Sequence, residues 1–213
     1  MVKNPNSPSR PRGRPRAYEP EVALQNAMGA FWQNGYSGTS LDAIAEATGM
    51  NRPSIYAAFG DKRSLYLTTL TRYVEGGGAA ISAALDQPLP LRESLRSAFK
   101  IVLNLYCPNE GTPLGCFLVC TAAAEAVSDA DVRSALYEGM RSVDQVFENR
   151  LRRAKAEGEL QAKADPVLLA RVASSVMHSL ALRSRAGDAR AELAATVEQA
   201  ITLLCGTTAS DGE

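Results

Sequence analysis

Apolar residues recur at intervals of three and four along most of this chain, which is the spacing of amphipathic helices. Near the start it is shown by Leu24, Ala27, Met28 and Phe31. The longest such stripe, within residues 129–157, contains Val132, Leu136, Met140, Val143, Phe147 and Leu151. Residues 114–127 are apolar almost all round, as expected of a buried central helix. The pattern therefore predicts an all-α fold with a long helical second half.

Residues 39–62, TSLDAIAEATGMNRPSIYAAFGDK, have the spacing of two short helices joined by a sharp turn. Gly49 can supply the left-handed backbone conformation that the turn needs. Asn51 can cap the second helix, and Pro53 fits in its first turn because a missing N–H is harmless there. These features predict a helix-turn-helix. Its second helix is expected to turn outward Arg52, Ser54, Tyr56 and Ala57.

Residues 35–66, GYSGTSLDAIAEATGMNRPSIYAAFGDKRSLY, resemble the DNA-binding head of the tetracycline-repressor (TetR) family of bacterial transcription regulators. The resemblance covers roughly residues 17–66. It implies a repressor that binds a palindromic double-stranded DNA operator as a homodimer and is released by a small-molecule effector. The alternative for the same pattern is a small helical module that binds protein.

The resemblance also assigns roles to residues of the head. It implies that Arg52 and Ser54 reach base edges, and that Thr39, Tyr56 and Lys62 touch the DNA backbone. Either Thr39 or Ser40 can cap the first helix of the motif, and a capped helix N-terminus can sit against a phosphate. The predicted DNA contacts of the head are Thr39, Ser40, Arg52, Pro53, Ser54, Tyr56 and Lys62.

Positive charge is concentrated at the start of the chain, although the formal net charge is zero. Residues 1–16 carry five basic residues and no acid, which leaves a charge of minus five on the remainder. This Pro- and Arg-rich segment cannot bury enough apolar surface to fold alone, so we expect a disordered arm. Its RGRP sequence is the core of the AT-hook motif. We predict minor-groove contacts by Arg12, Arg14 and Arg16, the alternative being a solubilising tail.

Beyond the head, residues 17–66, the sequence indicates an effector-binding and dimerisation domain, residues 67–206, and a polar, disordered tail, residues 207–213. Gly76–Gly78 interrupt the helix that joins head and body. Each glycine in a helix interior costs about 1 kcal/mol relative to alanine, so we expect this helix to bend, fray or break. The triplet is then either a hinge that couples effector and DNA, or a loop between two helices.

The last two helices are rich in small residues that permit close helix packing. In the resembled family these helices pair with their copies in a second subunit. Because a single helix-turn-helix contacts few base pairs, we favour such a dimer over the alternative that both helices only close the core of one subunit. The predicted interface contains Leu168, Val172, Val176, Leu180, Leu193, Val197, Ile201 and Leu204.

The predicted effector site lies among the central helices. Its residues are Leu103, Cys116, Cys120, Tyr137, Met140, Met177 and His178. Cys116 and Cys120 share a helix face, and with Cys107 and His178 they could form a Cys₃His metal site or a thiol sensor. Their spacing fits no familiar zinc ribbon, and buried cysteines commonly serve as small apolar residues. We therefore predict no metal and no cofactor, with a redox or metal sensor as the alternative.

No enzyme motif is present in the sequence. It lacks a glycine-rich phosphate loop, a GxSxG elbow and an HExxH helix, and its single histidine excludes most histidine-based triads. The rival hypotheses are an acyl-type or redox enzyme and a constitutive DNA-binding protein without an effector. The second is disfavoured by the size of the apolar second half. No apolar run approaches the roughly 20 residues that span a bilayer, so we expect a cytoplasmic protein with no membrane partner.

Overall fold

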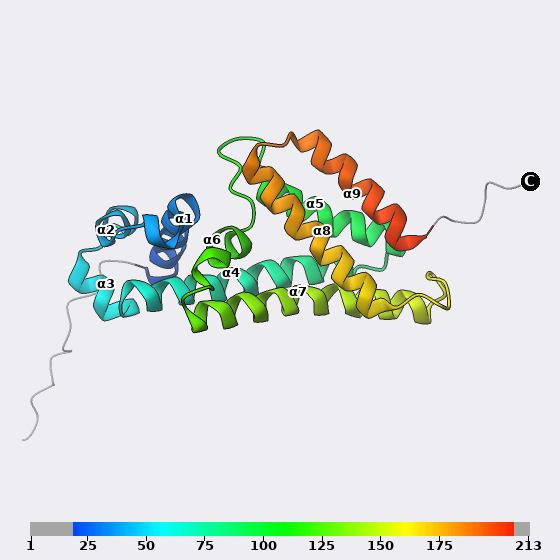
Figure 1. The fold of residues 1–213 in the computed structure, drawn as a ribbon, viewed down its shortest axis with the longest axis horizontal. Coiled ribbons are helices and arrows are strands. Elements are labelled where there is room, and N and C mark those ends of the chain that lie inside the picture. Colours follow the sequence, from blue (N-terminus) through cyan, green and yellow to red (C-terminus); the bar gives the residue numbers. More distant parts are fainter. Residues whose placement is uncertain (1–18, 207–213) are drawn as a thin grey trace, which may run out of the picture.

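The computed structural model describes residues 19–206, and every regular element in that part of the chain is an α-helix (Figure 1). The predicted all-α fold is confirmed. The helices are α1 (Pro20–Gly38), α2 (Leu41–Thr48), α3 (Arg52–Phe59), α4 (Lys62–Leu85), α5 (Leu91–Tyr106), α6 (Phe117–Glu125), α7 (Ala130–Ala156), α8 (Pro166–Ala186) and α9 (Arg190–Cys205). The predicted arm and tail lie outside the described residues.

Helices α1 to α3 form the head at one end of the molecule, at the left of Figure 1. Gly35, with φ of 71°, breaks the helical path of α1 before its last residues. The Ser40 side chain caps α2, which decides between the two predicted cap residues. Gly49 ends α2 in the left-handed conformation, and the Asn51 side chain caps α3. The predicted helix-turn-helix is therefore present.

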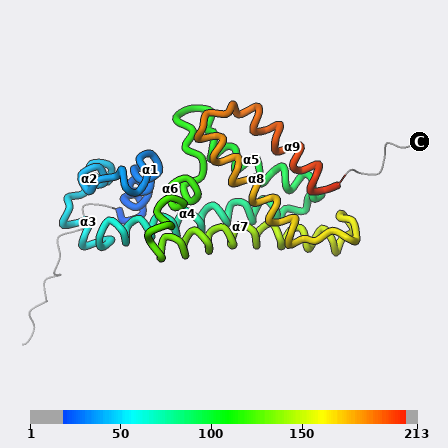
Figure 2. Tube along the Cα trace, viewed as in Figure 1, coloured from blue at the N-terminus to red at the C-terminus, as the bar shows by residue number. Residues whose placement is uncertain are grey.

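Helix α4 runs without interruption from Lys62 to Leu85, from under the head to the far part of the body (Figure 2). The predicted break at Gly76–Gly78 was wrong, because all three residues keep helical backbone and none has a positive φ. Packing along α7, which lies beside α4, stabilises the helix against the low helix propensity of glycine. The predicted domain boundary at residue 66 falls inside α4, so head and body share one helix.

A chain of aromatic rings also joins head and body. The ring of Phe31 in α1 lies 5.1 Å from that of Tyr66 in α4, and the Tyr66 ring lies 6.0 Å from that of Phe117 in α6. Phe31, Tyr66 and Phe117 are fully buried. Edge-to-face pairs of this kind contribute beyond their buried area, so the two parts form one continuous core.

The inner face of α7 differs from the prediction at one position. Gly139 is buried where the pattern had placed Met140, which is exposed. A Cβ atom at Gly139 would lie 2.7 Å from Leu118 Cδ2 and 2.9 Å from Val74 Cγ2. Glycine thus lets α7 approach α4 and α6 closely, and a pattern based on large apolar side chains could not register it.

Helix α6 begins later than the apolar run suggests. Gly115, with φ of 68°, turns the chain just before the helix, and Cys116 occupies the N-cap position. A Cβ atom at Gly115 would lie 2.3 Å from the Ala181 carbonyl oxygen of α8. This glycine therefore permits the approach of the α6 entrance to α8, which shapes the interior described next.

Candidate functional site

The recognition surface of the head is the exposed face of α3. Tyr56 is 49% exposed, Arg52 and Pro53 are exposed, and Ser54 is half-buried in the first turn. Ile55 turns the opposite way and is fully buried. The outward set agrees with the predicted reading face, and a short helix presented in this way fits a DNA major groove.

Arg52 is held by an acidic residue of α2 rather than standing free. Its Nε donates to Asp42 Oδ1 at 2.8 Å, and its Nη2 donates to Asp42 Oδ2 at 2.6 Å. Both side chains are more than half exposed, so this pair contributes little to stability and can exchange partners. The geometry orients the guanidinium at the end of α3 from which it was predicted to reach a base.

Thr39 does not present its side chain at this surface. It is 1% exposed, and its hydroxyl donates to the Gly35 carbonyl oxygen at 2.6 Å. The predicted phosphate contact by this side chain is corrected: the hydroxyl instead stabilises the corner between α1 and α2. Ser40, the residue that caps α2, is the exposed one of the two.

Lys62 lies over the Tyr36 ring, with its Nζ 4.3 Å from the ring centroid. Burial lowers the pKa of this ammonium group. The contact is a cation–π interaction that places the ammonium at the start of α4. The predicted contacts by Arg12, Arg14 and Arg16 lie outside the described residues.

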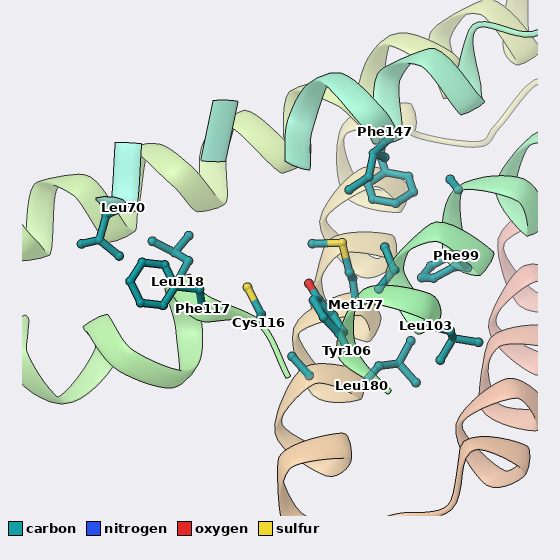
Figure 3. Packing of buried hydrophobic residues seen from close by; sticks show 14 of the residues in the cluster. Leu70, Phe99, Leu103, Tyr106, Cys116, Phe117, Leu118, Phe147, Met177 and Leu180 are labelled. Carbon is teal, nitrogen blue, oxygen red and sulfur yellow. The ribbon is translucent and has the colours of Figure 1, made fainter. Parts of the chain in front are cut away.

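A cavity of about 480 Å³ lies inside the body, with the first helix of the head as one of its walls. It is lined by Gln25, Met28, Trp32, Arg72, Tyr73, Val74, Gly76, Gly77, Gly78, Ala80, Ile81, Ile101, Val102, Leu105, Tyr106, Cys116, Leu118, Gly139, Val143, Met177 and His178. Figure 3 shows Cys116, Tyr106 and Met177 grouped between α6, α5 and α8. Such a size and apolar lining suit a small-molecule ligand.

Three of the seven predicted effector residues line this cavity, namely Cys116, Met177 and His178. The other four do not. Tyr137 is 65% exposed and Met140 is also exposed, because Gly139 takes the inner position of α7. Leu103 is buried in the core beside Val102, which lines the cavity in its place, and Cys120 lies one helical turn beyond Cys116.

Trp32 of α1, which was not among the predicted effector residues, also lines the cavity. Its Nε1 donates to the Leu114 carbonyl oxygen at 3.2 Å, and its ring packs edge-on to Tyr73. Arg185 of α8 donates to the carbonyl oxygens of both Trp32 and Leu114. A ligand in the cavity would therefore contact Trp32, which hydrogen bonds connect to the loop before α6 and to α8. Sequence spacing alone could not reveal this position.

The polar groups around Cys116 are neutral. The Tyr73 hydroxyl donates to Cys116 Sγ at 3.4 Å, and burial raises the pKa of both Tyr73 and Tyr106. Burial lowers the pKa of His178, so its imidazole is neutral near pH 7. Within residues 19–206 no three His, Cys, Asp or Glu side chains gather in a way that could hold a metal ion. The Cys₃His alternative therefore has no support in the described part of the chain.

The predicted dimer surface is only partly available. Leu180 of α8 and the α9 residues Leu193, Val197, Ile201 and Leu204 are buried inside the subunit, because α9 packs on α5 and α8. The predicted apolar stripe is present in both helices, but in α9 it faces the core of its own subunit. The side chains that remain outside are Leu168, Val172 and Leu182 of α8, Leu203 of α9 and, half-buried, Val176. We call these five residues the outer apolar face.

A helix-turn-helix head on a helical body with an internal apolar cavity is the arrangement of a ligand-responsive DNA-binding regulator. The chain belongs to the TetR family of DNA-binding transcriptional regulators. The family described as "Bacterial regulatory proteins, tetR family" matches residues 23–69, and "Tetracyclin repressor-like, C-terminal domain" matches residues 93–200.

Individual relatives agree with this assignment. The HTH-type transcriptional repressor ComR of Escherichia coli (strain K12) is 29% identical over 177 residues, which are 83% of this chain and 84% of ComR. The repressor BdcR of the same strain is 27% identical and covers 90% of this chain and 92% of BdcR. Among solved structures, a cysteine mutant of the TetR family regulator CifR in complex with 26-base-pair operator DNA superposes on this chain with a TM-score of 0.78. The match covers 88% of this chain and 98% of the CifR chain, and the two sequences are 34% identical.

None of the helices between residues 19 and 206 is long and apolar enough to cross a membrane.

Proposed function

We propose that this protein is a repressor that binds a palindromic operator as a homodimer and leaves it when a small molecule fills the body cavity. The observation that best supports this proposal is the capped helix α3, whose outer face presents Arg52, Ser54 and Tyr56. Ligand-dependent release is typical of the family, and the 480 Å³ cavity supports it here. The role involves no catalytic step and takes place in the cytoplasm of a bacterial cell, where the chromosome lies.

The proposed dimer forms through the outer apolar face. Four of its five side chains are large, apolar and exposed on adjacent helices α8 and α9. A second copy related by two-fold symmetry would cover them with the same residues. Two heads would then read two half-sites on successive turns of the duplex, about 34–36 Å apart. The arm, with Arg12, Arg14 and Arg16, adds contacts in the flanking minor groove.

Selection of bound sites from a random DNA library tests the operator-reading role. Arg52→Ala should relax discrimination at one position of each half-site by roughly 1–3 kcal/mol. Lys62→Ala should leave the selected motif unchanged, weaken all sequences alike and flatten the salt dependence by about one unit. An unchanged motif with Arg52→Ala would refute the assignment of this residue.

A thiol sensor is the second candidate, and it is favoured by one observation. Cys116 lies in the cavity wall at the N-cap of α6, with the Tyr73 hydroxyl donating to its sulfur. Oxidation of this thiol would add a polar group to an apolar wall. Peroxide should then weaken operator binding by the wild type and by Cys205→Ser, but not by Cys116→Ser. Equal sensitivity of all three proteins would remove this candidate.

A further inference from the structure

Neither backbone conformation nor helix packing requires glycine at residues 76–78 in the middle of α4. None of the three has a positive φ, and a Cβ atom at Gly76 or Gly77 would meet no atom within 4 Å. At Gly78 the nearest atom, Ser142 Oγ, would lie at an ordinary 3.9 Å. Alanine would fit at each position and favour the helix by about 1 kcal/mol. Folding therefore does not explain the absence of side chains at these three positions, so the reason is to be sought in what surrounds them.

All three glycines line the body cavity. They leave one stretch of its wall as bare helix backbone, in which Gly76 is exposed and Gly77 and Gly78 are half-buried. Ile101 and Leu105 of α5 line the same cavity and are exposed, although both are large and apolar. The cavity is therefore open to solvent on its α5 side, where its margin is apolar.

The only charged residue among the lining residues is Arg72, whose side chain is 51% exposed and pairs with Glu21 at 2.7 Å and with Glu75 at 3.7 Å. The remaining polar lining consists of Gln25, Tyr73, Tyr106, Cys116 and His178. Away from Arg72 the lining offers no charged partner, and burying a carboxylate or an ammonium group without a partner is costly, so the interior of the cavity discriminates against ionised molecules.

We propose that the cavity binds an uncharged, largely apolar small molecule whose body lies against the bare backbone of Gly76–Gly78, with one neutral polar group hydrogen-bonded inside. This inference rests on the proposed function, since it names the chemical class of the effector. The glycines give the ligand close contact with α4 that any larger side chain would prevent. Dispersion and apolar burial supply the affinity, and the neutral donors and acceptors fix the orientation.

The wild-type protein offers a direct readout, because Trp32 lines the cavity and is the only tryptophan in the chain. Three probes of equal chain length separate charge from size: 1-octanol, octanoate and octylammonium, at about pH 8, where the last two are ionised. We expect 1-octanol to change Trp32 fluorescence saturably and to raise the melting temperature. Each ion should bind at least about tenfold more weakly, because its charge loses water without gaining a partner. Equal binding of the ions would overturn the proposal.

Gly77→Leu and, independently, Gly76→Leu test the place of the ligand. Each adds a side chain at a residue that lines the cavity, and the new Cβ atom meets no other atom within 4 Å, so both should fold. Either should weaken 1-octanol binding at least about tenfold, since the side chain takes the ligand's volume. Ala79→Leu is the matched control, because residue 79 lies on the same helix, is exposed and does not line the cavity. Unchanged 1-octanol binding in both glycine variants would overturn the proposed contact.

Operator binding, measured in parallel on the same proteins, separates this inference from the proposed function. If 1-octanol binds as expected but leaves operator affinity unchanged, the ligand class stands and effector release fails. If the wild type binds operator but no uncharged probe occupies the cavity, the ligand class fails and the DNA-binding role stands.

Discussion

At the scale of single residues, the largest fully buried side chain belongs to a cation, Arg150 of α7. Its Nη2 donates to Glu159 Oε1 at 2.8 Å and to the Leu89 carbonyl oxygen at 3.0 Å, and its Nε donates to Ser94 Oγ at 3.0 Å. The guanidinium thus ties α7 to the α4–α5 loop, to α5 and to the segment after α7. The helical pattern of the sequence gives no sign of this, because an arginine in an amphipathic helix is normally placed on the solvent side.

Arg150→Ala should destabilise the protein by about 3–5 kcal/mol, because it removes the cationic partner of Glu159, two further hydrogen bonds and the largest side chain of this buried site. Lys155→Ala is the control on the same helix. Its ammonium group makes one solvent-exposed hydrogen bond, to the Ala164 carbonyl oxygen at 2.7 Å, and its loss should cost about 0.5 kcal/mol. Urea unfolding followed by circular dichroism measures both. Equal effects of the two substitutions would contradict the structural role of Arg150.

His178 should make stability depend on pH. Burial lowers its pKa in the folded state, so below the ordinary value of about 6.5 the unfolded chain binds a proton that the folded chain does not. Stability should therefore fall as pH drops from 7.5 toward about 5.5. The contribution of this residue is the part that disappears in His178→Gln, since no other histidine is present. Parallel curves for both proteins would show that burial does not perturb this imidazole.

At the scale of elements, the glycines show which features could be predicted from the sequence and which could not. The Gly49 turn and the Asn51 cap could be predicted because local backbone chemistry determines them. The continuity of α4 and the inner position of Gly139 could not, because both depend on what packs against the helix. The same reason explains the candidate site: Trp32 and Gly76–Gly78 acquire their positions in the cavity wall only from the assembly of α1, α4, α5 and α8.

Two glycine substitutions should have opposite effects on stability. Gly76→Ala should stabilise the protein by up to about 1 kcal/mol, because a Cβ atom meets nothing there and alanine favours the helix. Gly139→Ala should destabilise it by about 1–3 kcal/mol, because its Cβ atom would press on buried Leu118 and on Val74. Urea midpoints of the two variants measure this. Stabilisation by both would mean that α7 can move away from α4 and α6 without loss.

At the scale of the whole molecule, the apolar pattern predicted the right surfaces but could not say what covers them. The stripe of α9 is covered by α5 and α8 of its own subunit, whereas part of the stripe of α8 stays outside. Both stripes look alike in sequence, because apolar spacing is the same for a helix that meets its own chain and one that meets a second copy.

Val172→Asp combined with Leu182→Asp should split the proposed dimer. Both side chains are exposed in the subunit, so the substitutions leave its core intact but would bury carboxylates between two copies. Sedimentation should show helical monomers that have lost operator binding. Tyr137→Asp, at an exposed apolar position of α7 outside the outer apolar face, is the control and should remain dimeric. A persistent dimer in the double variant would place the interface on another surface.

Because α4 is one continuous helix, a change of its direction at one end is transmitted along its whole length. Its 24 residues make a rod about 36 Å long, at 1.5 Å per residue. Near one end Arg63 donates to Asp129 at 2.6 Å and to Asp131, which pins the rod to the start of α7. The cavity wall at Gly76–Gly78 lies farther along the same rod. Because of this link the head end of α4 can move only together with the start of α7. If the two helices tilt together by about 5°, the ends of such a rod shift by about 3 Å relative to each other, a displacement that a fixed spacing of DNA grooves would register.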